Sequence, residues 1–327
     1  MIIARCPLRV SLAGGSTDLE EFIDTHEKGS VISFPCNLYT YITLFSDKNG
    51  FNSVNKNYII NYTSREEVES VDDIKNDLAR EALKYFDMPP VSSNFNTDVF
   101  SMGSGLASSS SYLVALVKAI SSFSNKQGVA ISVCAEALEI ERKFNPLTGY
   151  QDPFGCGMAY FKKMEFKRGG KILTKNYRSS SLFDNHDSYL IHTGINRSST
   201  DVLRTLDLEK AKESLPLVHE LDNAITREDH KTTFKVIKEC WAIKKQTSTK
   251  ILDNPQLQDL DEALERDDRV RAHKLCGAGA GGYFLAFTEK GVDIADVVKN
   301  FNKISFKVKP DNSGVQVANV GKSATFM

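Results

Sequence analysis

A glycine- and serine-rich segment directly before an apolar run constrains this chain more than any other feature. The segment GSGLASSSS spans residues 103–111, and the apolar run follows at 112–117. Glycines allow positive φ angles and let the backbone approach a ligand closely. A helix that starts here points free N–H groups and the positive end of its dipole at an anion. The segment therefore predicts a phosphate-binding loop without the lysine of a P-loop, the alternative being a plain linker before a core helix.

The order of the expected elements favours an α+β fold over a doubly wound parallel sheet. We expect strands at 2–12, 38–45, 58–62 and 94–100, and helices at 74–86, 106–123 and 129–144. Further on we expect short strands within 157–177, a strand at 188–193, several helices over 198–266, a strand at 283–287, a helix at 294–301 and a strand at 314–320. The polar stretch 178–187 predicts a boundary between a domain at 1–180 and a second at 181–327.

Composition narrows the class of protein without naming an activity. The 327 residues are enough for two domains with substantial cores. The 41 basic and 42 acidic residues nearly balance, so we expect no nucleic-acid partner. No apolar run approaches the length of a bilayer span, so no membrane partner is expected either. The six scattered cysteines form no C-x-x-C pair, which is typical of a reduced, cytoplasmic protein. The sequence does not indicate an oligomeric state.

A second glycine-rich segment, GAGAGG, occupies residues 277–282 and precedes the strand expected at 283–287. By itself this pattern is weak, because it is also found in tight turns where two backbones touch. It indicates either such a turn or a second ligand-binding loop.

Three acidic residues in the middle of the chain are candidates for metal binding or proton transfer. Glu139 and Glu141 lie on the helix expected at 129–144, and residues two apart on a helix point about 200° from one another. The two glutamates therefore cannot easily face the same metal ion, and helix geometry alone does not indicate which of them would bind it. Asp152 follows the helix and precedes Pro153, which is also typical of a turn residue.

The N-terminal segment PLRVSLAGGSTD, residues 7–18, places Arg9 on a strand and Asp18 beyond a Gly-Gly turn. Arg9 could be an ordinary exposed strand residue. Asp18 could be the N-cap of a short helix at 19–24, with Glu21 at the capping-box position.

Taken in order, residues 7–18, 101–109 and 277–282 resemble the three motifs of the GHMP kinases, the superfamily of galactokinase, homoserine kinase, mevalonate kinase and phosphomevalonate kinase. The resemblance implies ATP-dependent phosphorylation of a small molecule, with Mg²⁺. It also implies a two-domain α+β fold, in which an N-terminal domain like ribosomal protein S5 domain 2 lies beside a C-terminal α+β domain. The middle motif departs from the usual pattern at Ser101, where proline is common, and at Ala107, where glycine or serine is common.

The resemblance also assigns roles to individual residues. It implies that Asp152 and Arg9 are catalytic and that Ser109 and Glu141 bind Mg²⁺, since Glu141 stands in the E-R context of the family. ATP would contact Gly103, Ser104, Gly105, Leu106, Ala107, Ser108 and Ser109 of the first loop, and Gly277 and Gly279 of the second. The substrate would contact Gly15, Ser16, Thr17 and Asp18.

Within the superfamily, the GGSTD segment at 14–18 and the TGINRS segment at 193–198 resemble the D-glycero-D-manno-heptose 7-phosphate kinases. That branch phosphorylates the anomeric hydroxyl to give a 1,7-bisphosphate for nucleotide-activated heptose synthesis. Arg197 would bind the sugar phosphate, unless it pairs with Asp201 along a helix.

Other functions remain open at this point. They are a sugar 1-kinase of the galactokinase, fucokinase or N-acetylhexosamine kinase type, and a regulator that binds ATP and sugar without turnover. The combination of Arg9, Ser109, Glu141 and Asp152 favours an enzyme. A Rossmann dehydrogenase is disfavoured because no G-x-G-x-x-G unit follows an early strand.

Overall fold

The computed structural model describes residues 1–45, 56–100, 103–126, 128–177, 181–195 and 199–320, which form two β-sheets with helices packed on them. The first sheet contains β1 (Ile2–Ala13), β2 (Lys28–Phe45), β3 (Tyr58–Asn61), β4 (Arg65–Val68), β5 (Ser92–Thr97), β6 (Lys162–Lys167), β7 (Lys171–Asn176) and β12 (Gln316–Asn319). The second sheet contains β8 (His186–His192), β9 (Val270–Leu275), β10 (Tyr283–Glu289) and β11 (Ile304–Val308).

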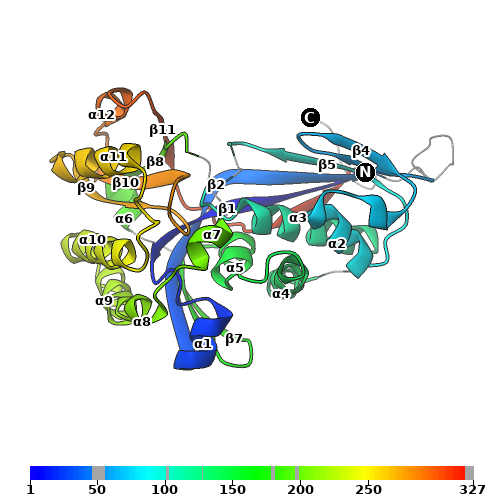
Figure 1. Cartoon of the computed structure of the whole chain (residues 1–327), viewed down its shortest axis with the longest axis horizontal. Coiled ribbons are helices and arrows are strands. Elements are labelled where there is room, and N and C mark those ends of the chain that lie inside the picture. The colour runs from blue at the N-terminus through cyan, green and yellow to red at the C-terminus, as the bar shows by residue number, and fades with distance from the viewer. Residues whose placement is uncertain (46–55, 101–102, 127, 178–180, 196–198, 321–327) are drawn as a thin grey trace.

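The helices divide in the same way between the two sheets (Figure 1). Around the first sheet lie α1 (Glu20–His26), the 3₁₀ turn η2 (Val71–Asp73), α2 (Asp77–Tyr85), α3 (Ser108–Phe123), α4 (Ala130–Arg142) and α5 (Gln151–Gly157). With the second sheet go α6 (Ser181–Asn185), α7 (Ser199–Leu203), α8 (Leu208–Lys212), α9 (Ser214–Thr226), α10 (His230–Gln246), α11 (Pro255–Arg266) and α12 (Ala295–Lys299). None of the helices in the described ranges is long and apolar enough to cross a membrane.

The first sheet has the order β12-β1-β2-β5-β3-β4, and β2 is long enough to pair with β5 at one end and β6 at the other. Its α3 packs on β1 and β2, and α5 packs on β1. The first half of β1 alternates between buried and partly buried residues, as expected for one covered face. From Cys6 to Ala13 every residue is buried, because this end of β1 is covered on both faces.

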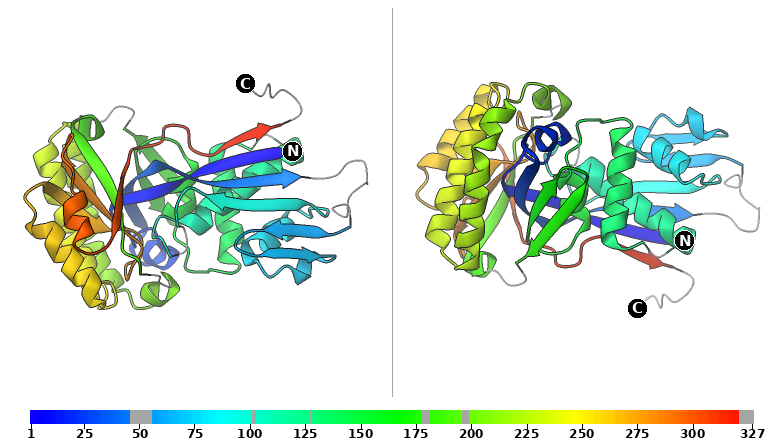
Figure 2. Two further views of the ribbon diagram at one scale, coloured as in Figure 1. Left: turned by 90° about the horizontal axis from the view of Figure 1, so that it is seen from above. Right: turned by 90° about the horizontal axis from the view of Figure 1, so that it is seen from below.

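The second sheet has the order β11-β8-β10-β9, with α10 and α11 packed on β9. These helices lie side by side in both views of Figure 2. A shared hydrophobic core joins the two sheets, since Leu8 and Phe34 of the first pack in one cluster with Leu190 and Phe287 of the second. The two layers therefore meet along a common interface near the buried end of β1.

The α+β fold expected from the sequence is confirmed, and most expected elements are present with shifted ends. The missed elements include β4, α6, β9, β11 and α5, the last of which places Asp152 in the first turn of a helix rather than in a turn. The N-cap interpretation of Asp18 is wrong. The cap position of α1 is Leu19, and no side chain caps it.

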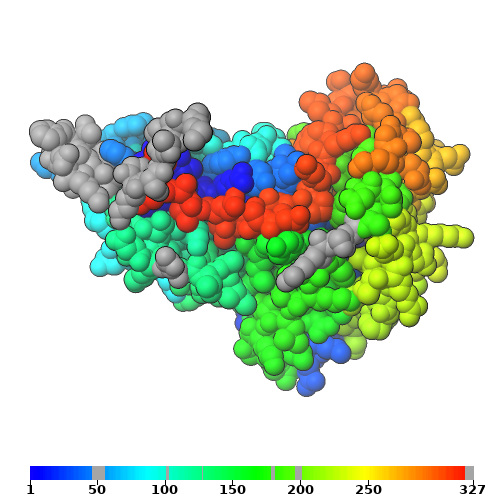
Figure 3. Space-filling view, turned by 180° about the vertical axis from the view of Figure 1, so that it is seen from behind, coloured from blue at the N-terminus to red at the C-terminus, as the bar shows by residue number. Residues whose placement is uncertain are grey.

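The division into domains at 1–180 and 181–327 stays a prediction, but one segment does not follow it. After β11 the chain crosses the back of the molecule and returns to the first sheet (Figure 3). There β12 pairs antiparallel with β1, with Ile2 opposite Asn319. The last described strand therefore belongs to the sheet formed by the N-terminal part.

Candidate active site

A cavity of about 390 Å³ lies where the two layers meet. Its walls come from the end of β1 and the turn after it, the 103–107 loop with the start of α3, the start of α5, and, across from these, α10 and the end of β9. All three motif segments singled out in the sequence reach this cavity.

The glycine- and serine-rich loop has the conformation expected of a phosphate-binding loop. Gly103 and Gly105 have φ angles of 64° and 76°, and Ala107 at φ 60° is in the left-handed region immediately before α3. Ser104 fixes the loop internally, because its hydroxyl accepts a hydrogen bond from the Leu106 N–H at 3.2 Å and lies 2.7 Å from the Ser108 hydroxyl. The start of the 16-residue α3 is thereby directed into the cavity.

The loop residues do not all face the cavity. Gly103, Ser104, Gly105, Ala107, Ser108 and Ser109 line it, as expected from the sequence. Leu106 does not line it, since its side chain is fully buried in the core shared by the two sheets. Its contribution to a nucleotide site would come from fixing the loop.

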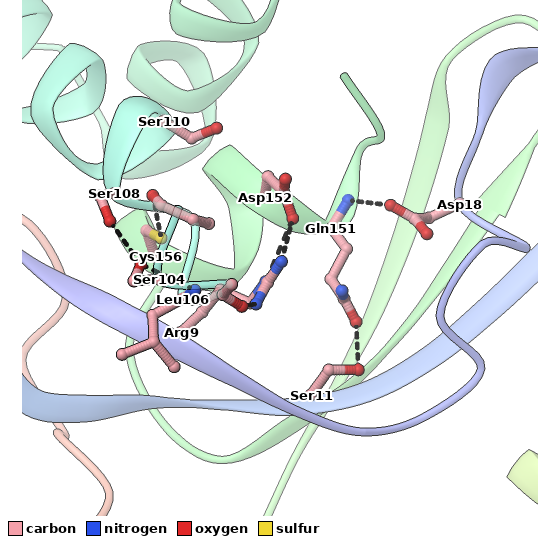
Figure 4. A network of polar contacts seen from close by, with 12 residues as sticks. Arg9, Ser11, Asp18, Ser104, Leu106, Ser108, Ser110, Gln151, Asp152 and Cys156 are labelled. Atoms are coloured by element: carbon pink, nitrogen blue, oxygen red, sulfur yellow. Dashed lines mark hydrogen bonds and ion pairs between the residues drawn. The ribbon is translucent and has the colours of Figure 1, made fainter. Parts of the chain in front are cut away.

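Arg9 and Asp152, 143 residues apart in the chain, form an ion pair inside the cavity (Figure 4). The guanidinium donates from Nε at 3.1 Å and from Nη2 at 2.6 Å, and both bonds end on Oδ1 of Asp152. A third bond runs from Nη1 to the Gly105 carbonyl at 2.6 Å, which ties the pair to the glycine- and serine-rich loop. Burial would lower the pKa of Arg9, but the Asp152 carboxylate outweighs it and raises that pKa.

Glu141 is buried, lines the cavity and accepts a hydrogen bond from the Ser110 hydroxyl at 2.5 Å. Burial raises the pKa of Glu141 to about 7, assisted by the negative charge of Asp152 and opposed by hydrogen bonds from Ser110 and Ser109. Glu139 lies elsewhere: it is exposed and accepts a bond from the Tyr85 hydroxyl at 2.9 Å. The two glutamates therefore point to different environments, and Glu141 is the one in the cavity.

Asp18 also lines the cavity, and it lies on the side of Asp152 that is turned away from Ser104 and Ser108 (Figure 4). Its carboxylate accepts backbone N–H bonds from Ser16 at 3.1 Å and from Gln151 at 3.0 Å. Burial raises the pKa of Asp18 to about 6, and the charge of Asp152 acts in the same direction. A Cβ at Gly149 would lie 2.1 Å from Oδ2 of Asp18, so this position requires glycine for the carboxylate to fit.

Among the substrate residues expected from the sequence, Gly15 and Ser16 line the cavity and Thr17 does not. The Thr17 hydroxyl donates to the Gly14 carbonyl at 2.8 Å and accepts from the Ser30 N–H at 3.0 Å. Thr17 therefore shapes the turn that presents its neighbours. Arg197 lies outside the described residues.

The second glycine-rich segment packs against the first loop. Gly282, with φ 90°, approaches the Ser104 carbonyl so closely that a Cβ would lie 2.3 Å from that oxygen, and the Tyr283 N–H donates to the same carbonyl. Gly277 lines the cavity, whereas Gly279 does not and instead approaches Ile251. The segment is thus a tight contact between backbones, as one interpretation of the sequence had it, and its role as a binding loop stays a prediction.

Several cavity residues were missed by sequence reasoning. Ser110 contacts Glu141, and Gln151 accepts a bond from the Ser11 hydroxyl at 2.8 Å, which links β1 to α5. Lys244 on α10 and Lys274 on β9 also line the cavity. No short motif marks these positions, although Ser110 lies next to Ser109 in the same serine run.

The donor set of this cavity fits a magnesium ion. The Glu141 carboxylate is buried beside two serine hydroxyls, and Mg²⁺ in phosphotransferases is usually held by one or two protein oxygens together with substrate phosphates. Within the described ranges there is no cluster of three or more His, Cys, Asp or Glu side chains that would form an all-protein metal cage. Glu141, Ser110 and Ser109 would hold the ion.

A profile of a known protein family matches part of the N-terminal half of the chain. Residues 74–160 match the profile of the GHMP kinases N terminal domain. Residues 74–160 therefore resemble a GHMP kinase N-terminal domain, and the fold of the chain is similar to that of a solved mevalonate kinase, with a TM-score of 0.70 at 15% identity.

One curated protein and two solved structures are similar to nearly the whole chain. The chain is 29% identical over 309 residues to the D-glycero-alpha-D-manno-heptose 7-phosphate kinase of Campylobacter jejuni, covering 88% of this chain and 89% of that protein. A D-glycero-D-manno-heptose 1-phosphate kinase from Bacteroides thetaiotaomicron has a similar structure, with a TM-score of 0.76, 19% identity and coverage of 98% and 99%. Galactokinase of Lactococcus lactis gives a TM-score of 0.74 at 14% identity, with coverage of 96% and 95%. These likenesses support an ATP-dependent sugar kinase.

Proposed function

We propose that this chain transfers the γ-phosphoryl group of ATP to the anomeric hydroxyl of D-glycero-D-manno-heptose 7-phosphate, giving the 1,7-bisphosphate. The observation that carries the proposal is the pairing of Arg9 with Asp152 between a phosphate-binding loop and a buried acidic substrate wall. The heptose phosphate is suggested by the names of the Campylobacter and Bacteroides relatives, which differ in the position of the phosphate.

Each wall of the cavity has a role in this reaction. The loop at 103–109 and the start of α3 would hold the triphosphate, with Gly277 completing the nucleotide side. Mg²⁺, when bound, would neutralise part of the phosphate charge, and Glu141 with Ser110 and Ser109 would position it. Asp18, Gly15 and Ser16 would orient the sugar.

Asp152 would remove the proton from the attacking hydroxyl. Both Arg9 bonds end on Oδ1, so Arg9 does not occupy Oδ2, and this oxygen can accept the proton. Arg9 holds the carboxylate in place and keeps positive charge beside the phosphate loop through its bond to Gly105. Because donor and acceptor would be held in one cavity, placement in line is the main contribution expected from the protein.

The test is ADP release from Mg-ATP with a panel of acceptors. Heptose 7-phosphate, heptose 1-phosphate, unphosphorylated heptose, galactose, fucose and an N-acetylhexosamine are compared at equal concentration. We expect the 7-phosphate to give the highest kcat/KM. A free hexose as the best acceptor would refute the heptose assignment and favour a galactokinase-like enzyme. Binding of sugar and ATP without ADP release from any acceptor would favour the regulator.

A further inference from the structure

Lys162 is a charged side chain in the interior of the first layer that has no role in the transfer scheme above. It is the first residue of β6, and none of its surface is exposed. Its ammonium donates to the carbonyls of Gly155 at 3.2 Å, Met158 at 2.7 Å and Tyr160 at 3.3 Å. All three acceptors are neutral backbone groups in or just after the last turn of α5. A buried ammonium held by neutral groups is costly, so its place in the fold needs an explanation.

The charge of Lys162 is directed at these carbonyls. Burial lowers its pKa to about 8, so the side chain is still charged at neutral pH. The other titratable groups that act on it come from β1, α4, α5 and the segment before β12, and they are Cys6, Cys134, Cys156 and Asp311. Burial raises the pKa of all three thiols, which therefore stay protonated at neutral pH. The Asp311 carboxylate accepts the Tyr39 hydroxyl at 2.7 Å.

Helix α5 depends on contacts of this kind for its direction. It has only seven residues, among them a proline and two glycines. A helix this short is not stable by itself, and its last carbonyls have no partners within the helix. At this end Lys162 holds the Gly155 carbonyl, and the Val315 N–H donates to the Gly157 carbonyl at 3.0 Å. These bonds fix the end of α5 against the first sheet.

The same part of α5 supports the Arg9–Asp152 pair. Gly155 lies directly on Arg9, since a Cβ at this glycine would lie 3.2 Å from Cγ of the arginine. Asp152 stands three residues earlier on the same helix and accepts the guanidinium bonds (Figure 4). The carbonyl that Lys162 holds thus belongs to the residue on which Arg9 rests. A shift of this helix would move the carboxylate and the support of the guanidinium together.

We propose that Lys162 is a positioning residue for phosphoryl transfer, whose ammonium fixes the end of α5 and thereby holds Asp152 in place against Arg9. The inference rests on the proposed kinase function and deepens it. Lys162 is not among the residues that line the cavity, so it acts through the helix rather than on a substrate. Misplacement of a reacting group by about 1 Å can cost about 10²-fold in rate, so a fixed helix end matters for in-line transfer.

The test is a double-mutant cycle of Lys162→Met and Asp152→Asn, with kcat measured on Mg-ATP and heptose 7-phosphate. We expect Lys162→Met to lower kcat about ten- to hundredfold in the wild-type background. In the Asp152→Asn background it should cost at least about fivefold less, because the carboxylate that it positions is already absent. The control is Lys163→Met on the other face of β6, where the lysine pairs with Glu165 and Asp222, and its kcat should resemble the wild type.

A role confined to stability would lower kcat by the same factor in both backgrounds, and this result would overturn the inference. The crystal structure of Lys162→Met gives a readout that needs no turnover. We expect the 2.6 Å distance from Arg9 Nη2 to Asp152 Oδ1 to lengthen beyond about 4 Å, which ends the ion pair. That result supports the positioning role even if the protein phosphorylates no acceptor. An unchanged pair overturns the role even if the protein is an active kinase.

A second variant disturbs the same helix end if Lys162→Met does not fold. In Gly314→Ala a Cβ would lie 2.6 Å from the Gly157 carbonyl oxygen, at a φ of 65°. Gly291→Ala, with a φ of 82° and open space around the added Cβ, is the control for backbone strain. We expect kcat to fall at least about tenfold further in Gly314→Ala than in Gly291→Ala. Equal losses in the two variants would overturn the inference.

Discussion

At the residue scale, the Arg9–Asp152 pair determines what the cavity can do. Asp152→Asn keeps an acceptor for Arg9 but removes the carboxylate that would take the proton. General-base assistance is typically worth about 10²–10⁴ in rate. We therefore expect kcat to fall by that range while the affinity for ATP, measured by equilibrium binding, stays close to wild type. Wild-type turnover at saturating acceptor would remove Asp152 from the mechanism.

The two glutamates of α4 give a matched pair of variants. Glu141→Ala removes a buried carboxylate from the cavity, whereas Glu139→Ala removes an exposed one bonded to Tyr85. We expect the Mg²⁺ concentration needed for half-maximal rate to rise at least about tenfold in the first and to be unchanged in the second. Similar shifts in both would show that the metal lies outside the Glu141 wall.

Asp18 predicts a pH dependence of stability in the protein without ligands. Its pKa is raised from 3.8 to about 6, so the folded state binds the proton more tightly than the unfolded state. Between these values the unfolding free energy contributed by this group therefore falls as pH rises, by at most about 3 kcal/mol, and then stays constant. Asp18→Asn, which cannot titrate, should lose this part of the slope. Denaturant unfolding at pH 4.5 and 7.5 measures it, and identical slopes in both proteins would contradict the assignment.

The residues of the cavity show what a sequence can and cannot predict at this scale. Arg9, Asp18, Glu141 and Asp152 were found through motif resemblance, although 143 residues separate Arg9 from its partner. Ser110 was missed because the orientation of each serine depends on the left-handed Ala107 that starts α3. Lys244 and Lys274 could not be found, because α10 and β9 reach the cavity only through the packing of the second layer.

At the element scale, the contact between the two glycine-rich segments couples the layers. Gly282→Ala would place a Cβ 2.3 Å from the Ser104 carbonyl and also strain a φ of 90°. Gly291 has a similar φ of 82° with no atom within 4 Å of an added Cβ, so Gly291→Ala tests the φ strain alone. We expect the free energy of unfolding, measured with denaturant, to fall by about 1–3 kcal/mol in both variants. KM for ATP should rise only in Gly282→Ala.

The outcome that would contradict this coupling is an unchanged KM for ATP in a folded Gly282→Ala protein.

The helices and strands that carry the site were only partly predictable from the sequence. Helix α3 and strand β10 follow from long apolar runs, whereas α5 begins within a stretch that contains a helix-limiting proline. Pro153 is tolerated because it lies in the first turn, where its missing N–H has no partner in any case.

At the scale of the whole molecule, the cavity exists only because two sheets share one core. The 103–109 loop at one wall of the cavity comes from the first layer, whereas Lys244, Lys274 and Gly277 at another wall come from the second. Both must be in place for a donor and an acceptor to be held in line. The α+β class and the order of motifs could be predicted from the sequence, but the return of β12 to β1 could not, because strand pairing over more than 300 residues leaves no local signal.

The most direct test of the account is ³¹P NMR of a reaction containing the protein, Mg-ATP and heptose 7-phosphate. The account predicts that the γ-phosphate signal of ATP is lost as ADP forms, and that an equal amount of a second sugar phosphate signal grows, split by the anomeric proton. The 7-phosphate signal should persist in the product. ATP consumption that yields only inorganic phosphate, or a new phosphate on any carbon other than the anomeric one, would contradict it.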